Sequence, residues 1–319
     1  MDEFRLIGAI KRAVRGPIDP RVEIGIGDDA AVLSVKSGRL VATTDALVEG
    51  VHFRFDMSRP ADVGSKAAAV NLSDLAAMGA RPLALLVALE VPNAMADRDV
   101  VSAMRGLAQV AAIFGASVVG GNVSSGPVFT MTVTALGEPC AGRVLTRAGA
   151  QPGDVVMVGG PLGSGALGLD LLEHNRGKVR TYPELVRRYR RPEPQVELGM
   201  RLAAEPGVDA AIDLSDGLAS DLGHVLAASC CGARIDADRI PMHVQALRYA
   251  RLRGLDARIV ALTGGDDYLL LVAAKPEVVT SLLSAGMTAI GCVTKRRGLV
   301  IESGGSRLVL PAGSGWRHR

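Results

Sequence analysis

The chain has 319 residues, which is long enough for two domains that each bury a hydrophobic core. Its 48% hydrophobic and 22% charged residues are typical of a globular protein and exclude a disordered or fibrous chain. A net charge of +3 is too small to indicate a nucleic-acid partner, and no uninterrupted apolar run is long enough to span a membrane.

Strands and helices alternate in the first half of the chain. The predicted strands cover residues 38–47, 82–91, 116–121 and 128–137, and the predicted helices cover residues 60–79 and 97–114. The turn-rich stretch 146–154 then predicts a domain boundary. We therefore expect one domain over residues 1–147 and a second over residues 148–319.

The second half mixes the same two kinds of element. The predicted helices cover residues 164–176, 183–190, 194–204, 215–226 and 276–286, and the predicted strands cover residues 155–160, 209–214, 266–274 and 288–293. The densest basic run, 187–191, is interpreted as a solvated helix face. The sequence thus predicts a mixed α/β (α+β) fold in two domains.

The four cysteines form no CxxC pair, and two of them are neighbours in sequence. This pattern favours neither a disulfide framework nor a zinc site. The first residues also lack the apolar core of a signal peptide. We therefore expect a reduced, cytoplasmic protein.

Acidic residues recur where the predicted elements begin or end. They are Asp28, Asp29, Asp45, Asp74, Asp213, Asp216, Asp266 and Asp267, and most are flanked by glycine or a hydroxyl residue. The ends of elements are where a rigid scaffold places functional groups. Each aspartate also has a simpler interpretation as a turn residue or, for Asp216, as a helix N-cap.

Asp74 is the hardest of these to explain by local structure. It lies one helical turn after Val70 and one before Met78, on an apolar stripe. A carboxylate there needs a partner or a metal ion, because burying an isolated charge costs several kcal/mol. Carboxylates with hydroxyls, and with little His or Cys, are the ligands of a hard cation, and magnesium fits best.

Two glycine-rich segments have alternative interpretations. Gly163, Gly165 and Gly168 form a GxGxxG after a predicted strand, but the acidic residue about twenty positions later is missing, so a tight turn explains them better than nicotinamide binding. The glycine pair ending at Gly121 would let backbone N–H groups approach phosphate oxygens, and a hairpin connection explains it equally well. The sequence contains no Walker motif, protein-kinase signature or GxSxG elbow.

Nine blocks in register resemble the thiamine-monophosphate kinases, a family of the aminoimidazole-ribonucleotide-synthetase-like superfamily. They are GIGDDAAV, TTDALVEGVHF, NLSDLAAMGA, GGNVSSGP, LTRAGAQPGD, IDLSDGLASDLGH, CGARID, TGGDDYLLL and GWRH. The resemblance implies the superfamily's two-domain architecture, a homodimer formed through the N-terminal domain, and a cleft between the domains for ATP and substrate. It implies magnesium-assisted transfer of the ATP γ-phosphoryl group to thiamine monophosphate, which gives thiamine diphosphate.

The resemblance also assigns roles to residues of this chain. Its magnesium positions are Asp29, Thr43, Thr44, Asp45, Asp74, Asn122, Asp213 and Asp216. Its ATP positions are Gly121, Asn122, Arg147 and Ser215, and its thiamine phosphate positions are His52, Asp266 and Trp316. No general base is expected, because the acceptor phosphate is already ionised at neutral pH.

Two positions depart from the family pattern. Asn122 stands where the family usually has Asp, which removes one negative charge from a metal position, and Asp266 stands where it usually has Glu. Two alternatives therefore stay open: a non-catalytic paralogue that binds nucleotide or thiamine phosphate, and another ATP-dependent enzyme of the same superfamily. A nicotinamide oxidoreductase is a third, motivated only by the GxGxxG.

Overall fold

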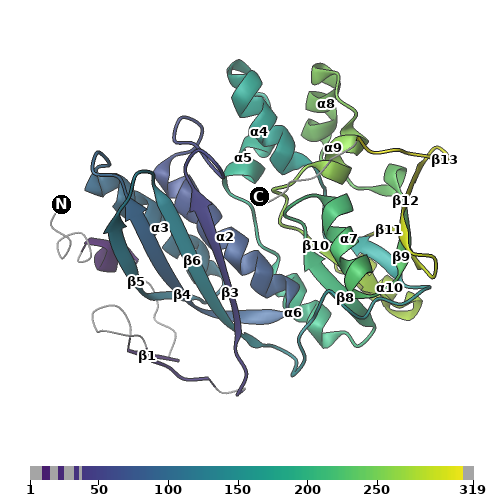
Figure 1. The fold of residues 1–319 in the computed structure, drawn as a ribbon, viewed down its shortest axis with the longest axis horizontal. Helices are drawn as coiled ribbons and strands as arrows, with labels where there is room; N and C mark the ends of the chain where they lie inside the picture. The colour runs from purple at the N-terminus through teal and green to yellow at the C-terminus, as the bar shows by residue number, and fades with distance from the viewer. Residues whose placement is uncertain (1–8, 15–20, 25–31, 36–37, 312–319) are drawn as a thin grey trace. The chain divides into compact units, whose positions relative to one another are not determined.

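The computed structural model describes residues 9–14, 21–24, 32–35 and 38–311 of the chain (Figure 1). The chain divides into two compact units: unit 1 comprises Met1–Leu75 with Ala80–Gly142, and unit 2 comprises Ala76–Gly79 with Arg143–Arg319. Both units contain helices and strands, which confirms the predicted mixed α/β class. The predicted domain division between residues 147 and 148 stays a prediction.

Unit 1 is built around a four-stranded sheet. Its elements are the short pair β1 (Val22–Ile24) and β2 (Val32–Leu33), then β3 (Val41–Val48), α2 (Pro60–Ala77), β4 (Ala80–Val91), α3 (Asp97–Ile113), β5 (Ser117–Ser125) and β6 (Thr130–Pro139). The strand order in the sheet is β3-β6-β4-β5, with only the β4–β5 pair parallel. Helices α2 and α3 lie behind this sheet in the view of Figure 1.

Helices α2 and α3 of unit 1 are buried to different extents. Helix α2 is rich in alanine, and Ala67, Ala68 and Leu72 have no exposed surface. In α3 the buried residues recur at helical spacing, with Val100, Met104 and Leu107 among them, and polar residues cover the opposite face. Strand β4 lies between β6 and β5, which explains its long apolar run.

Unit 2 is built around a seven-stranded sheet with the order β13-β12-β9-β11-β7-β10-β8. Its strands are β7 (Val155–Val158), β8 (Val208–Asp213), β9 (Gly232–Asp236), β10 (Leu270–Ala274), β11 (Thr288–Thr294), β12 (Gly298–Ser303) and β13 (Ser306–Arg307). Of the pairs in this sheet, only β12 with β9 is parallel.

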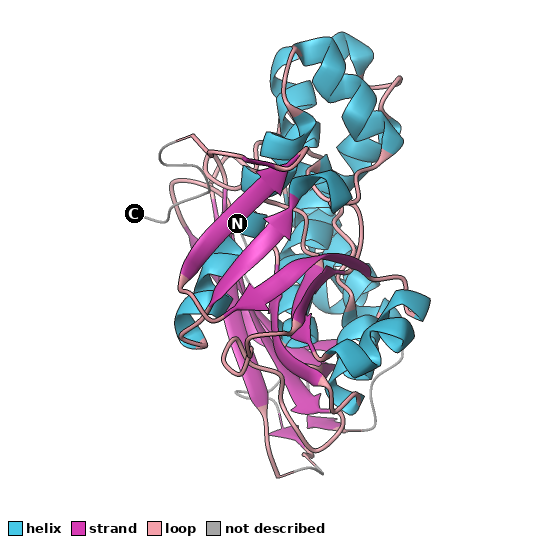
Figure 2. Ribbon diagram, turned by 90° about the vertical axis from the view of Figure 1, so that its right-hand side faces the viewer, coloured by secondary structure: helices cyan, strands magenta, loops and turns pink. Residues whose placement is uncertain are grey.

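Seven α-helices are described in unit 2. They are α4 (Ser164–His174), α5 (Pro183–Arg190), α6 (Val196–Ala204), α7 (Leu218–Ala228), α8 (Val244–Arg253), α9 (Ala257–Thr263) and α10 (Val279–Ser284). Helices α4, α5 and α8 gather at the top of Figure 1, where Figure 2 also shows a group of helices beyond the sheet. No described helix is long and apolar enough to cross a membrane.

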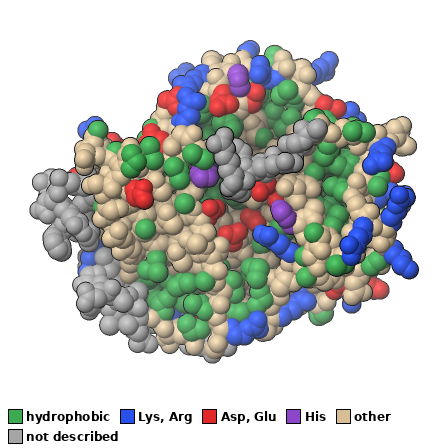
Figure 3. Space-filling view, in the orientation of Figure 1, with side chains coloured by type: hydrophobic (Ala, Val, Ile, Leu, Met, Phe, Trp, Pro, Cys, Tyr) green, Lys and Arg blue, Asp and Glu red, His purple; other side chains and the backbone are tan. Residues whose placement is uncertain are grey.

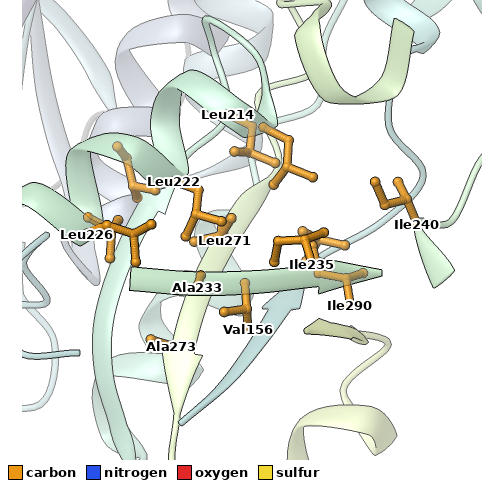
Figure 4. Packing of buried hydrophobic residues seen from close by; sticks show 14 of the residues in the cluster. Val156, Leu214, Leu222, Leu226, Ala233, Ile235, Ile240, Leu271, Ala273 and Ile290 are labelled. Atoms are coloured by element: carbon orange, nitrogen blue, oxygen red, sulfur yellow. The ribbon is translucent and has the colours of Figure 1, made fainter. Parts of the chain in front are cut away.

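The core of unit 2 is aliphatic, as the scarcity of aromatic residues predicts. Figure 4 shows Val156 and Leu271 from neighbouring strands facing Leu222 and Leu226 of α7. Ile235 and Ile290 extend the cluster along β9 and the strand beside it. Burying such side chains stabilises the fold by about 1.5–3 kcal/mol each.

The basic run of α5 is paired with acidic residues. Glu184 accepts from Arg187 at 2.7 Å and from Arg188 at 2.9 Å, and Glu193 pairs with Arg187. The Arg187 hydrogen bond is the main reason that the pKa of Glu184 is lowered to about 2. Acidic and basic side chains accordingly stand side by side over α4 and α5 at the top of Figure 3.

The sequence analysis did not predict every element. Strands β9 and β12 and helices α8 and α9 are absent from it, because each is short and has a weak local pattern. Strand β10 begins at Leu270, so the prediction of a strand from Asp266 is wrong over its first four residues. The cause is the left-handed backbone conformation of Asp266 and Tyr268, which lie in the candidate site.

Candidate functional site

The site residues predicted from the sequence fall into both units. Asp29 and Trp316 lie outside the described residues, as does Asp28. Unit 1 carries Thr43, Thr44, Asp45, His52, Asp74, Gly121 and Asn122, and unit 2 carries Arg147, Asp213, Ser215, Asp216 and Asp266.

In unit 1, strand β3 and helix α2 bring Thr43 and Asp74 together. The Thr43 hydroxyl donates a hydrogen bond of 2.6 Å to Oδ2 of Asp74. Asp74 is half-buried, so this bond supplies the polar partner that a carboxylate on an apolar stripe requires. The pair also places a hydroxyl oxygen beside a carboxylate oxygen, and oxygen atoms are the ligands that hard cations prefer.

Strand alternation separates the predicted ligands of β3. Successive side chains point to opposite faces of a sheet, so Thr43 and Asp45 share one face and Thr44 takes the other. There Thr44 Oγ1 donates to the carbonyl oxygen of Val133 and accepts from Thr134 Oγ1, both at 3.1 Å. The structure thus joins Thr43 to α2 and Thr44 to β6, and a ligand role for Thr44 stays a prediction.

Asp45 and His52 lie at the exposed end of this region. Asp45 is exposed, and its Oδ1 accepts the N–H of Ala46 at 2.8 Å. After β3 the chain turns, and His52 Nδ1 accepts the N–H of Val48 at 3.0 Å. Because a backbone N–H can only donate, Nδ1 is the bare nitrogen of His52 and Nε2 carries the hydrogen. That N–H suits a phosphate oxygen.

Gly121 and Asn122 lie inside β5 and not at a strand end, which corrects the sequence prediction. The strand continues to Ser125 because the 12-residue β4 offers it a parallel partner. Gly121 has a φ of +152°, and a Cβ there would lie 1.9 Å from the carbonyl oxygen of Val87. Close packing against β4 is therefore a sufficient reason for glycine at position 121. The ATP contact of Gly121 stays a prediction.

In unit 2, Asp213 ends β8 with 6% of its surface exposed, and the loop to α7 carries Ser215 and Asp216. The N-cap of α7 is Gly217, without a side-chain cap, so the interpretation of Asp216 as an N-cap is wrong. Instead the N–H of Asp216 donates to Oδ2 of Asp221 at 3.0 Å. The first turn of α7 thus holds the loop through Asp221, a residue that the sequence analysis did not single out.

Three carboxylates gather at this loop. The pKa of Asp221 is raised to about 7: burial is the largest cause, the charges of Asp216 and Asp213 act in the same direction, and hydrogen bonds from the backbone partly oppose them. Asp213 and Asp216 are therefore close enough to Asp221 to repel it. A bound cation would relieve this repulsion.

The loop 264–268 has an unusual backbone. Asp266 and Tyr268 have φ values of 66° and 51°, in the left-handed region that residues with side chains seldom adopt. The Tyr268 hydroxyl donates to Oδ1 of Asp266 at 3.0 Å. Left-handed residues cannot continue a strand, which explains why β10 begins only at Leu270.

Asp267, between these two residues, binds the N-terminus of α4. It is 7% exposed; its Oδ2 accepts the N–H of Gly163 at 2.6 Å and its Oδ1 accepts the N–H of Gly165 at 3.2 Å. Burial raises the pKa of Asp267 to about 7, although these two hydrogen bonds lower it. A carboxylate of the protein itself thus occupies the end of the helix.

This contact explains the GxGxxG without a dinucleotide. The N–H groups that would bind a pyrophosphate in a dinucleotide-binding fold already donate to Asp267. Strand β7, which precedes the motif, also has antiparallel neighbours on both sides, whereas that fold requires a parallel sheet. Gly163, with a φ of 80°, serves the tight turn that the sequence analysis favoured, whereas Gly165 and Gly168 lie inside α4, where a Cβ would lie 2.3 Å from the carbonyl oxygen of Asp266 and 2.2 Å from that of Leu185.

Arg147 is exposed near the start of unit 2, where its carbonyl oxygen accepts from Ser229 Oγ at 3.2 Å. This bond fixes the backbone and leaves the guanidinium on the surface. Its predicted pairing with phosphate is compatible with that exposure and stays a prediction.

The available ligands fit magnesium better than a soft metal. Among residues 9–14, 21–24, 32–35 and 38–311, no three His, Cys, Asp or Glu side chains are arranged to hold a metal ion by themselves. The candidate donors are hydroxyl and carboxylate oxygens in each unit taken by itself: the pair Thr43–Asp74 in unit 1 and the carboxylates at Asp213 and Asp216 in unit 2. Magnesium uses few protein ligands and keeps water and phosphate oxygens in its shell, so this donor set suits it.

Two family models match the chain in order. The N-terminal domain of the AIR synthase related proteins matches residues 27–138, and the C-terminal domain of the same proteins matches residues 151–304. Each match lies within a stretch that is mostly assigned to one unit. The two models together account for most of the chain and confirm the superfamily that the sequence blocks indicated.

Individual relatives identify the family within this superfamily to which the chain belongs. The thiamine-monophosphate kinase of Escherichia coli K12 is 40% identical over 303 residues, which cover 91% of this chain and 87% of the relative. The crystal structure of thiamine-monophosphate kinase from Stenotrophomonas maltophilia K279a has a TM-score of 0.84 at 36% identity, with 95% and 97% of the two chains covered. A structure of "AaThiL complexed with AMPPCP and TMP" has a TM-score of 0.81 at 31% identity, with 99% and 97% covered. The chain therefore belongs to the thiamine-monophosphate kinase family of the AIR synthase related proteins.

Proposed function

We propose that this kinase transfers the γ-phosphoryl group of ATP to thiamine monophosphate and releases thiamine diphosphate. The observation that carries the proposal is the 40% identity to the E. coli thiamine-monophosphate kinase over 91% of the chain. The neighbour complexed with AMPPCP and TMP supports the same pair of ligands. The hydroxyl–carboxylate pair in unit 1 and the carboxylate cluster in unit 2 supply the chemistry that such a reaction needs.

Magnesium ions are proposed to be held by oxygen ligands of both units. In unit 1 these are Asp45 and the bonded pair Thr43 and Asp74, and in unit 2 they are Asp213 and Asp216. Three further positions, which follow from the resemblance alone, are Asp29, Thr44 and Asn122. When bound, magnesium supplies positive charge that offsets the negative charge of the phosphates.

The remaining predicted residues bind and orient the two substrates. The Arg147 guanidinium and the Gly121 and Ser215 positions are proposed to hold the ATP phosphates. The Nε2–H of His52 donates to the phosphate of thiamine monophosphate, since its Nδ1 is already engaged. Asp266 offers a carboxylate to the cationic thiamine, and Trp316 offers an aromatic face.

The reaction needs positioning more than acid–base catalysis. The acceptor is an ionised phosphate, so no residue has to remove a proton before attack. The barrier arises because two polyanions must approach in line, and opposing charge with rigid positioning lowers it. This requirement accounts for a site made of aspartates and hydroxyls without a nucleophile–base pair.

The test is a direct assay. The purified protein is incubated with thiamine monophosphate, ATP and magnesium, and thiamine diphosphate is measured by chromatography. Asp45→Asn is the matched control, because Asp45 is exposed and we expect the isosteric asparagine to fold like the parent. We expect product from the parent and at least 100-fold less from the variant, since a metal ligand is lost.

A second outcome would identify a binding protein instead. Asn122, which replaces an acidic residue of the family, motivates this alternative. If both ligands bind but no product forms at saturating magnesium, the proposed activity is excluded for this chain. Asn122→Asp would then be expected to restore turnover if the missing charge is the cause.

The protein is further proposed to be a cytoplasmic homodimer with functional domains at residues 1–147 and 148–319. Strands β3 and β5 are the edges of the four-stranded sheet in the described part of unit 1, and such edges favour pairing with a second chain. Light scattering of the purified protein measures the mass: twice the 33.1 kDa of one chain supports the dimer, and a single chain mass excludes it.

A further inference from the structure

The GGDDY segment at 264–268 is tied to its surroundings at several points. The carboxylate of Asp267 holds the N–H groups of Gly163 and Gly165 at the start of α4. The N–H of Asp266 donates to the carbonyl oxygen of Ser215 at 2.9 Å, and the N–H of Tyr268 donates to that of Leu214 at 2.8 Å. The segment is thereby fixed both to α4 and to the loop that carries the acidic cluster.

The backbone on both sides of Asp267 is strained. Among the described residues, only three that are not glycine have a positive φ, and two of them are Asp266 and Tyr268. A left-handed backbone at two such residues persists only where the surroundings impose it. The buried anchor at Asp267 lies between the two and imposes it together with the backbone bonds to Ser215 and Leu214.

The packing leaves this segment no alternative position close by. A Cβ on Gly165 would lie 2.3 Å from the carbonyl oxygen of Asp266, so the start of α4 touches the backbone of the segment. A Cβ on Gly265 would likewise lie 2.3 Å from the carbonyl oxygen of Ser215. The start of α4 and the loop at Ser215 therefore enclose the segment closely, so its backbone has no room to move toward either of them.

We propose that Asp267 and Tyr268 are positioning residues for Asp266. Asp267 holds the backbone in the conformation that presents Asp266, and the Tyr268 hydroxyl, 3.0 Å from Oδ1 of Asp266, sets the direction of its carboxylate. The inference rests on the proposed function, in which Asp266 contacts thiamine monophosphate. It gives the GxGxxG of this chain a role: the turn binds a carboxylate of the protein and so shapes the substrate side of the site.

The test compares two variants with one matched control. Asp267→Asn keeps the size of the side chain and loses one acceptor oxygen, and Tyr268→Phe removes only the hydroxyl. Asp154→Asn is the control, because Asp154 is also a buried aspartate of unit 2 that accepts a backbone N–H, from Gln151 at 2.7 Å. It precedes β7, whereas Gly163 follows that strand, so Asp154 holds a different turn.

Measuring both KM values and the melting temperature distinguishes a loss of positioning from a loss of stability. We expect Asp267→Asn to raise the KM for thiamine monophosphate at least tenfold and Tyr268→Phe to raise it about threefold, while the KM for ATP changes less than twofold in both. The control should lower the melting temperature without changing either KM. A KM for thiamine monophosphate that stays at the parent value in both folded variants would overturn the proposal.

Two further measurements keep the test decisive. If Asp267→Asn does not fold, Tyr268→Phe decides, because it leaves the anchor in place: an unchanged KM for thiamine monophosphate overturns the proposal. Hydrogen exchange of the Gly163 and Gly165 amides needs no activity, and faster exchange in Asp267→Asn than in Asp154→Asn supports the anchor. If the parent protein neither binds nor converts thiamine monophosphate, the proposed function fails, while hydrogen exchange still reports on the anchor.

Discussion

The two units hold their candidate site residues by different physical means. In unit 1, Thr43 and Asp45 lie on a regular strand, Asp74 lies on a regular helix, and a hydrogen bond of 2.6 Å joins Thr43 to Asp74. In unit 2, Asp213 ends a strand, and Ser215, Asp216 and Asp266 lie on loops that are held by buried carboxylates and, at Asp266, have a strained backbone.

The difference shows what each arrangement demands of the rest of the protein. A strand positions side chains by its alternation, so a site residue there can change without disturbing the fold. A strained loop keeps its shape only through contacts such as that of Asp267 with α4, so position and stability are coupled. We therefore expect substitutions of Thr43 and Asp45 in unit 1 to affect mainly activity, and those around the unit 2 loops to affect activity and stability together.

The largest expected effect is that of Gly165→Ala. The new Cβ would lie 2.3 Å from the carbonyl oxygen of Asp266, so we expect a loss of about 2–3 kcal/mol in the free energy of unfolding. For a unit of this size that lowers the melting temperature by roughly 5–10 °C. Calorimetry measures the change.

Gly223→Ala is the matched control for that substitution. Gly223 lies within α7, and a Cβ there would meet nothing within 4 Å. Alanine is the better helix former, so we expect a gain of about 0.5–1 kcal/mol. If both substitutions lowered the free energy of unfolding equally, the contact between Gly165 and Asp266 would not be the cause of the loss.

Thr43→Val tests whether the hydrogen bond between Thr43 and Asp74 in unit 1 serves activity. The substitution removes the hydroxyl that bonds Asp74 and keeps a β-branched side chain that suits a strand. We expect kcat to fall about tenfold, which corresponds to about 1.4 kcal/mol, and the melting temperature to fall less than in Gly165→Ala, because the half-buried Asp74 loses a hydrogen bond but meets no clash. Steady-state kinetics and thermal unfolding are measured on the same samples.

Thr134→Val is the corresponding control on β6. Thr134 bonds Thr44 on the opposite face of the sheet, so its hydroxyl does not contact Asp74. We expect its kcat to fall less than that of Thr43→Val, because Thr134 touches the site only through Thr44. Unfolding of unit 1 by Thr43→Val alone would show that this site, too, is coupled to stability.

The smallest expected effect lies on a regular helix of unit 2. Hydrogen bonding to Arg187 lowers the pKa of Glu184 to about 2 from an ordinary value of 4.5, so its ionised form stabilises the folded state above about pH 4.5. That contribution is lost as the pH falls from 4.5 through 2. At a partly exposed pair we expect Glu184→Gln to cost on the order of 1 kcal/mol at pH 7.

Urea unfolding at pH 7 and at pH 3 measures this dependence. The difference between Glu184→Gln and the parent should shrink at the lower pH. Glu193→Gln is the control, since Glu193 is 61% exposed and should have the smaller effect. An equal difference at both pH values would contradict a role for the ionised carboxylate of Glu184.

The sequence by itself determined the parts of this protein that follow from local pattern. The helical spacing over 97–114, the apolar run at 82–91 and the Ala-rich helix ending near Gly79 correspond closely to α3, β4 and α2. These elements form because their periodicity matches the face that they bury. The resemblance of the motif blocks, which the family models confirm, also came from the sequence alone.

Only the tertiary structure decided which aspartates hold the protein together. By local pattern Asp266 and Asp267 are equivalent neighbours, although the family resemblance gave a role to Asp266, and Asp221 is one more residue of a helix. Asp267 became an anchor because Gly163 and Gly165, about a hundred residues earlier, lie against it, and Asp221 became one because the chain turns back at Asp216. A local pattern carries no record of such partners, since hydrogen bonds between distant segments exist only once the chain has folded.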